Sequence, residues 1–178
     1  MIDQVLNFWF EECDPQQWFI KDEAFDKKVE SLFSLLHEEI AEKKHTVWRL
    51  SARGCLAEII VLDQFSRNMF RGSANAFAFD IQARDCLNYA ISMAYDKELS
   101  QIERNFLYLP FEHSEASSDQ EKSIFYYSKN GDPDALDYAI KHKLIIDTFA
   151  RYPHRNEVLG RISTEEEELF LRTPGSKF

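Results

Sequence analysis

The stretch DEAFDKKVESLFSLLHEEIAEK, residues 22–43, decides the fold class. Its apolar residues recur three or four positions apart, as they do along one stripe of an amphipathic helix. Asp22 stands where a helix begins, and no part of the chain alternates apolar and polar residues as a strand does. The sequence therefore predicts an all-α protein. The stripe consists of Phe25, Val29, Leu32, Phe33, Leu36 and Ile40.

The same helical period recurs along the rest of the chain. Two capping boxes, Ser100-x-x-Glu103 and Thr164-x-x-Glu167, mark helix starts. Pro110 is expected to kink or end the helix that contains it. Further helices are expected over residues 3–10, 51–65, 80–95, 100–110, 117–129, 132–150 and from 164 onward.

Two more helix starts follow from turn chemistry. Ser117 or Ser118 is expected to cap the helix before Lys129. In NGDPDA, residues 130–135, Gly131 ends one helix, and Asp132 caps the next with Pro133 as its first residue. About eight helices with short connections predict stacked antiparallel hairpins in a single domain, residues 1–178.

Composition limits the class of function. The net charge of −10 disfavours nucleic acid and anionic membranes as partners. Cys13, Cys55 and Cys86 have no CxxC or zinc-ligand spacing, and the last two are expected to be buried free thiols. No signal peptide is recognisable, and the longest apolar run is only IIVL. We expect a cytoplasmic protein.

A first polar cluster lies in LDQFSRNMFRG, residues 62–72. Its arginines could cap a helix C-terminus, which is the structural interpretation. They could equally form a fork for a carboxylate or phosphate, because arginine donates to both oxygens of such groups. The candidate ligand-binding residues here are Asp63, Gln64, Arg67, Asn68 and Arg71.

A second cluster lies in LPFEHSEAS, residues 109–117. Glu112 and Glu115 are one helical turn apart, with His113 between them. Two carboxylates and an imidazole could share a proton, contact a ligand, hold a metal or bond to a neighbouring arginine. Our candidate catalytic residues are Glu112, His113 and Glu115 together with His154, and no metal ligand is assigned.

A third cluster lies in ARYPHRNEVLGR, residues 150–161, a basic bend in an acidic chain. His154 is a candidate catalytic residue; Arg155, Asn156 and Arg161 are candidate ligand-binding residues. Alternatively, the arginines pair with Glu112, Glu115 or Asp63, and both interpretations can hold together. The segments FSRNMFRG and YPHRNEVLG echo each other around an Arg-Asn pair. His37 and His142 are interpreted as ordinary helix-face residues.

Three hypotheses remain open. The clusters could form a small-molecule site in which arginines hold an anion and a histidine moves a proton. They could belong to a scaffold that binds a protein or acidic peptide, or they could be ionic networks that lock helix ends. No phosphate-binding loop, dinucleotide motif or nucleophile elbow is present. The sequence specifies neither a reaction nor a cofactor.

Several motifs together resemble a known family. In order, they are FWF, DPQQWF, LDQFSRNMFRG, FLYLPFEHSE, GDPDALDYA, RYPHRNEVLGRISTEEE and PGSKF. They resemble the bacterial uncharacterised proteins catalogued as domain of unknown function 924, over nearly the whole chain. Ser66 is a departure, because the family usually has proline before Arg-Asn. The resemblance implies a tetratricopeptide-like superhelical fold and a soluble bacterial protein, and it brings no activity, substrate or cofactor. The family's signature polar positions map onto the twelve candidate residues named above.

Overall fold

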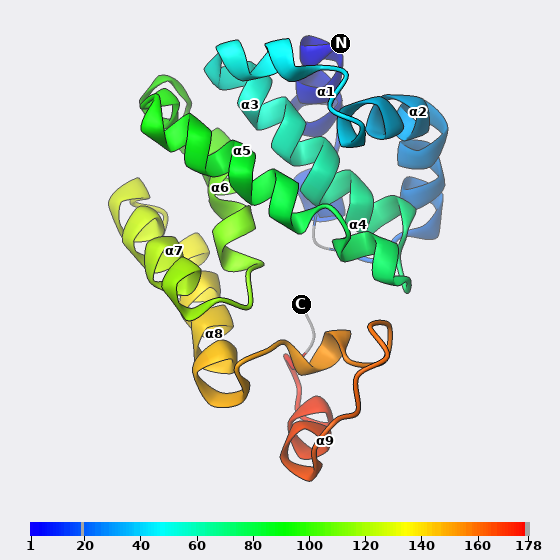
Figure 1. The fold of residues 1–178 in the computed structure, drawn as a ribbon, viewed down its shortest axis with the longest axis vertical. Coiled ribbons are helices and arrows are strands. Elements are labelled where there is room, and N and C mark those ends of the chain that lie inside the picture. The colour runs from blue at the N-terminus through cyan, green and yellow to red at the C-terminus, as the bar shows by residue number, and fades with distance from the viewer. Residues whose placement is uncertain (19, 177–178) are drawn as a thin grey trace. The chain divides into compact units, whose positions relative to one another are not determined.

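The computed structural model describes residues 1–18 and 20–176, and every regular element among them is helical (Figure 1). The prediction of an all-α protein is confirmed. Parts of two family-like motifs, namely Phe19 of DPQQWF and Lys177 and Phe178 of PGSKF, lie outside the described residues. The α-helices are α1 Ile2–Asn7, α2 Glu23–Ala41, α3 Ala52–Ile59, α4 Ser66–Met69, α5 Asp80–Ser92, α6 Gln101–Glu112, α7 Ser117–Asn130, α8 Pro133–Phe149 and α9 Glu165–Leu171.

The chain divides into two compact units. The N-terminal unit comprises Met1–Arg71 and Asn75–Pro110. The C-terminal unit comprises Gly72–Ala74 and the chain from Phe111 onward. A single domain over the whole chain stays a prediction.

Aromatic side chains fill the core of the N-terminal unit. The Phe8 ring lies 5.0 Å from Phe33, and Phe33 lies 4.6 Å from Phe65, measured between ring centroids. Trp9 makes edge contacts with Phe65 and Phe106 at 5.6 Å each. Aromatic rings packed edge to face add to the stability that burial of their area provides. This cluster joins α2, α6 and the π-helical turn Ile60–Phe65 to the segment Phe8–Glu12 that follows α1.

Helix α2 confirms the amphipathic pattern with one exception. Asp22 caps it, since its carboxylate accepts hydrogen bonds from the backbone N–H groups of Ala24 and Phe25. Leu32, which we placed on the core stripe, is 48% exposed. His37 is buried instead, because the buried face follows positions 29, 33, 36, 37 and 40. The prediction for Leu32 was wrong.

The helix expected over residues 51–65 runs further than predicted. After α3 the chain widens into a π-helical turn, Ile60–Phe65, and continues directly into α4. A π turn shifts the helical register, and such turns are frequent at functional sites. Arg67 and Asn68 therefore lie on a helix.

Helix α6 confirms its capping box and extends beyond its proline. The Ser100 N–H donates to the Glu103 carboxylate at 2.8 Å, and the Glu103 N–H donates back to the Ser100 hydroxyl at 3.4 Å. Pro110 lies inside the helix, which ends two residues later at Glu112. The helix therefore does not end at Pro110 itself.

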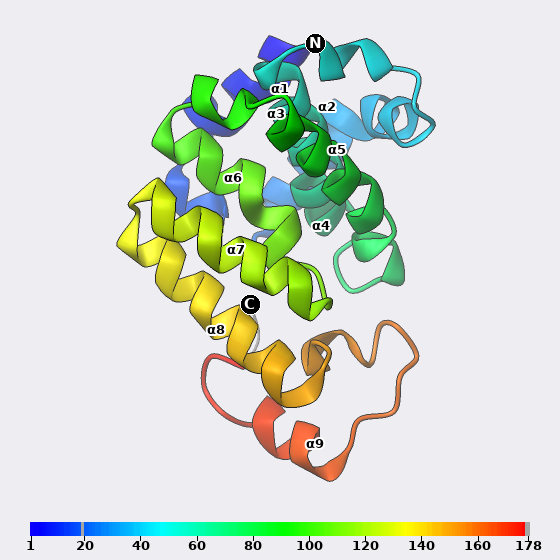
Figure 2. The same cartoon turned by 60° about the vertical axis from the view of Figure 1, so that its left-hand side comes forward.

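In the C-terminal unit, α7 and α8 pack together as an antiparallel hairpin, as Figure 2 shows. Gly131 has a left-handed backbone, and the Asp132 carboxylate caps α8, as predicted. The serine cap of α7 was wrong. Ala116 is the N-cap, and Ser117 is already helical, because the Ser114 hydroxyl accepts the Ala116 N–H one turn earlier.

No helix within residues 1–18 and 20–176 is long and apolar enough to cross a membrane. The three cysteines are free and buried, as expected for Cys55 and Cys86. The tetratricopeptide-like arrangement of the hairpins stays a prediction.

Candidate functional site

The basic bend of residues 150–161 begins where α8 ends. Ala150 adopts a left-handed backbone with φ of 57°, which turns the chain out of the helix. Pro153 opens a short 3-10 turn, Pro153–Arg155, because proline fixes the φ angle that such a turn needs. Tyr152 is fully buried and Arg155 is 6% exposed. The bend is therefore part of the core of the C-terminal unit.

The FEHSE segment, residues 111–115, includes the end of α6 and is hydrogen-bonded to the bend. The Gln120 side chain of α7 donates to the carbonyls of Glu112 and Ser114 at 2.8 and 2.7 Å. The Tyr152 hydroxyl also donates to the Glu112 carbonyl. These bonds satisfy carbonyls that a helix C-terminus leaves without an intrahelical donor. Two segments forty residues apart thus share one set of hydrogen bonds.

Glu115 and Arg161 clamp the bend to this segment. The guanidinium donates to both carboxylate oxygens, at 2.8 and 3.0 Å, and Arg161 also donates to the Tyr152 carbonyl at 3.1 Å. The Tyr152 N–H completes the clamp with a 2.8 Å bond to Glu115. Partial burial works to raise the pKa of Glu115, but the Arg161 and Tyr152 hydrogen bonds outweigh it and leave the pKa lowered. The predicted pairing of this bend with Glu115 is confirmed.

Glu167 of α9 makes a second clamp. Arg151 donates to its two carboxylate oxygens at 2.6 and 2.7 Å, and Asn156 donates to it at 3.2 Å. The Arg151 hydrogen bonds lower the pKa of Glu167 to about 2, against the opposing effect of desolvation. The same carboxylate completes the predicted capping box with Thr164. This clamp holds the far end of the bend.

Between the clamps, four rings and one guanidinium form what we call the ring cluster. The rings of His113 and His142 lie 6.2 Å apart, and His142 packs edge-on against Tyr152 at 5.7 Å. Tyr152 also contacts His154 at 5.5 Å, and the Arg155 guanidinium lies 4.5 Å from the Tyr152 ring centre. The cluster consists of His113, His142, Tyr152, His154 and Arg155.

The tautomer of His142 follows from its contacts. Its Nδ1 lies 2.9 Å from the Tyr138 carbonyl and 3.3 Å from a Glu112 carboxylate oxygen, and both are acceptors. Nδ1 therefore carries the proton. Burial, together with the charge of the neighbouring His113, lowers the pKa of His142 to about 3, so the ring is neutral at pH 7. Burial also raises the pKa of Tyr152.

The first cluster forms an aspartate–arginine network inside the N-terminal unit. Arg71 donates to both oxygens of Asp26 at 2.6 and 2.8 Å, and Asn68 donates to Asp26 at 2.8 Å. Arg67 lies 3.1 Å from Asp63 and 3.0 Å from Asp80. Carboxylates on α2, on α5 and in the π-helical turn just before α4 thus engage these donors. Gln64 donates to Asp63 at 2.6 Å.

The structure therefore brings together two of the three clusters within one unit. Glu112, His113 and Glu115 meet His154, Arg155, Asn156 and Arg161. The first cluster forms its own network in the other unit. The catalytic and ligand-binding roles assigned to these residues stay predictions.

Sequence reasoning missed three members of the site. His142 was interpreted as a helix-face residue, although it lies on the buried stripe of α8 with Ala139, Ile145 and Ile146. That spacing was a usable signal. Tyr152 and Gln120 carried none, because their importance depends on contacts between segments 32 residues apart.

Within the described residues, no group of three or more His, Cys, Asp and Glu side chains could hold a metal ion. The alternative that Glu112, His113 and Glu115 hold a metal ion therefore gains no support from the described residues.

The fold and the site define a class: an all-helical protein with a histidine–arginine cluster braced by two carboxylate clamps. The chain belongs to the family described as "Bacterial protein of unknown function (DUF924)", whose model matches residues 5–175. It is similar to the solved structure of a protein of unknown function, ATU0120, from Agrobacterium tumefaciens. The identity is 36%, each chain is covered over 96% of its length, and the TM-score is 0.92. No curated protein matches the chain.

Proposed function

We propose that the C-terminal unit binds a small anionic molecule at the ring cluster and that a histidine of the cluster moves a proton. The observation that carries this proposal is the run of contacts from His113 through His142 and Tyr152 to His154, with the Arg155 guanidinium on the Tyr152 face. Imidazole is the side chain suited to proton transfer near pH 7, and guanidinium suits carboxylate and phosphate.

The arginines of the bend have different roles in this proposal. Arg151 and Arg161 each spend two donors on one carboxylate, so we assign them to holding the bend. Asn156 donates to Ser163 and Glu167 and has the same role. Rigid support of this kind preorganises the groups that meet a ligand. In this proposal Arg155 holds the anion.

The histidines also divide by environment. His142 is buried and neutral, with Nδ1–H directed at Tyr138 and Glu112, so we assign it to orienting its neighbour His113. His113 and His154 are half-buried, and either of them is the proton carrier. The substrate class follows from the anion that Arg155 holds.

The test is thermal melting of wild type, Arg155→Lys and Arg151→Lys with a panel of phosphates, short dicarboxylates, divalent metals and common metabolites. Arg155→Lys keeps the charge but loses the planar fork; Arg151→Lys is the matched control in a clamp. A compound that raises the midpoint of wild type and of Arg151→Lys, but not of Arg155→Lys, supports the proposal. A panel in which no compound discriminates Arg155→Lys from wild type and Arg151→Lys argues against it.

A second candidate is a scaffold for a protein or an acidic peptide. The observation in its favour is three exposed apolar side chains on the α7–α8 hairpin: Phe125 is 49%, Tyr138 54% and Leu144 58% exposed. Lys129 and Lys141 lie over the rings of Phe125 and Tyr138 at 4.0 and 5.2 Å. Binding of an acidic peptide that is lost in Phe125→Ser but kept in Arg155→Lys would favour this candidate.

A further inference from the structure

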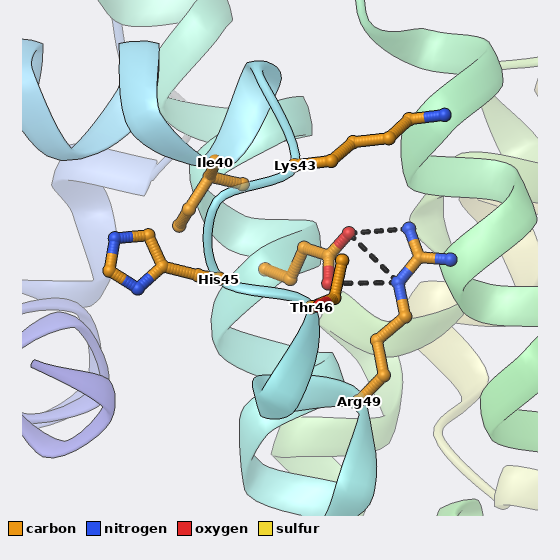
Figure 3. A pocket seen from close by; sticks show the side chains of 6 residues that line it. Ile40, Lys43, His45, Thr46 and Arg49 are labelled. Carbon is orange, nitrogen blue, oxygen red and sulfur yellow. Dashed lines mark hydrogen bonds and ion pairs between the residues drawn. The ribbon is translucent and has the colours of Figure 1, made fainter.

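A pocket of about 90 Å³ opens in the N-terminal unit, within a unit separate from the one that holds the ring cluster (Figure 3). One water needs roughly 15 Å³ of such space, so the pocket has room for a ligand of a few atoms. It lies where the turn after α2 meets the 3-10 turn Thr46–Leu50 and helix α3. Its lining residues are Ile40, Lys43, His45, Thr46, Arg49 and Glu58.

Positive charge dominates this pocket in an otherwise acidic chain. Arg49 donates through Nε and Nη2 to Glu58, at distances from 2.5 to 3.1 Å. This pairing neutralises the buried carboxylate and leaves the two N–H groups of Nη1 for another acceptor. His45 is paired with Glu39 at 2.8 Å. In the part of the chain that the structure describes, the Lys43 ammonium has no ion pair.

The backbone at Lys43 is the second observation. The hydrogen bonds from the Lys43 N–H to the Ile40 carbonyl and from the Lys44 N–H to the Glu39 carbonyl end α2 in a Schellman motif. Lys43 is the residue of this motif that adopts the left-handed backbone conformation, with φ of 61°. Glycine is preferred there, because other L-residues are strained in this conformation. A lysine at this position destabilises the turn and directs a long cationic side chain along the pocket.

Lys43 and Arg49 both line the pocket. Figure 3 shows the Lys43 ammonium and the Arg49 guanidinium on the same side of the turn that carries Thr46. Three ammonium N–H donors, two guanidinium N–H donors and one hydroxyl are the groups that tetrahedral oxyanions accept from. We propose that this pocket binds a free tetrahedral oxyanion, phosphate or sulfate, through Lys43, Arg49 and Thr46.

The test is a titration of the ¹⁵N-labelled protein with inorganic phosphate, and with sulfate, followed through the backbone amides of residues 43–49. These amides report the pocket separately from any anion at the ring cluster. We expect saturable shifts in wild type and at least a tenfold weaker Kd in Lys43→Gln, the size expected for losing one charge-assisted hydrogen bond. Lys44→Gln, which removes the same charge one residue away, should bind as wild type does.

Lys43→Gly separates binding from folding. Glycine relieves the left-handed strain, so this variant should melt at a higher temperature than wild type without phosphate, while its phosphate affinity falls as in Lys43→Gln. Three results would overturn the proposal: no saturable shift in wild type, unchanged phosphate affinity in both Lys43 variants, or equal shifts with chloride at matched ionic strength.

Discussion

Two Arg-Asn pairs, one in each unit, stand in contrasting surroundings. In both units the asparagine donates to a carboxylate, Asn68 to Asp26 and Asn156 to Glu167. A later arginine in each unit also donates to both oxygens of one carboxylate, Arg71 to Asp26 and Arg161 to Glu115. The pairs differ in the contacts of their first members. Arg67 contacts Asp63 and Asp80, whereas Arg155 lies on the Tyr152 ring among histidines and also acts electrostatically on Glu115.

In the function we propose, this difference separates the cluster that braces helices from the cluster that exchanges protons. Pairs of arginine and aspartate keep their charges across the whole physiological pH range, so they hold helices together and exchange no protons. Imidazoles change charge near neutral pH and can exchange protons. The similar segments FSRNMFRG and YPHRNEVLG therefore contribute to a structural ionic network in one unit and to a candidate site in the other.

The largest effect should come from removing a brace. Asp26→Ala leaves Arg71 and Asn68 without their shared acceptor in the N-terminal unit, and it should lower the free energy of unfolding by about 3 kcal/mol. Urea unfolding measures this, with Glu30→Ala on the same helix as the control. A loss below about 1 kcal/mol would show that the network does not brace the unit.

The buried histidines should make stability depend on pH. Burial lowers the pKa of His142 to about 3 and of His37 to about 4, from 6.5. The unfolded chain therefore binds protons that the folded chain does not, and stability falls as the pH drops from about 6.5 toward these values. In His142→Gln the unfolding reaction should take up about one proton fewer in this pH range. The free energy of unfolding should therefore fall less steeply with decreasing pH, by up to about 1.4 kcal/mol per pH unit.

His37→Gln sharpens the comparison between the units. In the N-terminal unit, Ser66 donates its hydroxyl proton to the Leu62 carbonyl, so His37 Nε2 must donate to Ser66 at 2.8 Å. This histidine should show the same pH effect as His142 although it lies outside the ring cluster. An unchanged pH slope in both variants, from urea unfolding at several pH values, would contradict the account of the two environments.

The clamp at Glu115 should contribute less than the Asp26 brace, because both partners are partly exposed. Arg161→Met should cost about 1–2 kcal/mol at pH 7. Because the clamp lowers the pKa of Glu115 in the folded state, its contribution is present above pH 4.5 and is lost as the pH falls below it. A difference between variant and wild type that stays constant down to pH 3 would contradict this.

The smallest effect concerns helix caps. Asp132→Ala should cost about 1 kcal/mol, since Asp132 accepts from the Asp134 and Ala135 N–H groups. Ser118→Ala should change stability by less than about 0.5 kcal/mol, because Ala116 is the N-cap of α7. Equal losses in these two variants, measured by thermal melting, would mean that the cap assignment is wrong.

Local patterns made most of the fold predictable. Helical period and capping boxes are properties of neighbouring residues, so Asp22, Ser100, Asp132 and Thr164 were recognised as starts. The π turn at residues 60–65 was missed, because its apolar residues read as an ordinary helix. The serine cap of α7 failed since Ser114, three residues earlier, takes over the capping turn.

The candidate site was only partly predictable, for a physical reason. Charged residues in short motifs stand out in a sequence, which is why Glu115, Arg155 and Arg161 were found. His142 and Tyr152 act through ring contacts with distant segments, and such contacts are set by packing. Sequence could also not show that Arg67 and Arg71 would be engaged by aspartates from α2 and α5.

The most direct test of the central claim compares the two units by calorimetric titration. Malonate and succinate, which are not tetrahedral oxyanions and so do not report the Lys43 pocket, would be titrated into wild type, Arg155→Gln and Arg71→Gln. Our account predicts that at least one of these anions binds wild type and Arg71→Gln with similar affinity and binds Arg155→Gln at least tenfold more weakly. Equal binding to all three proteins, or loss of binding in Arg71→Gln alone, would contradict it.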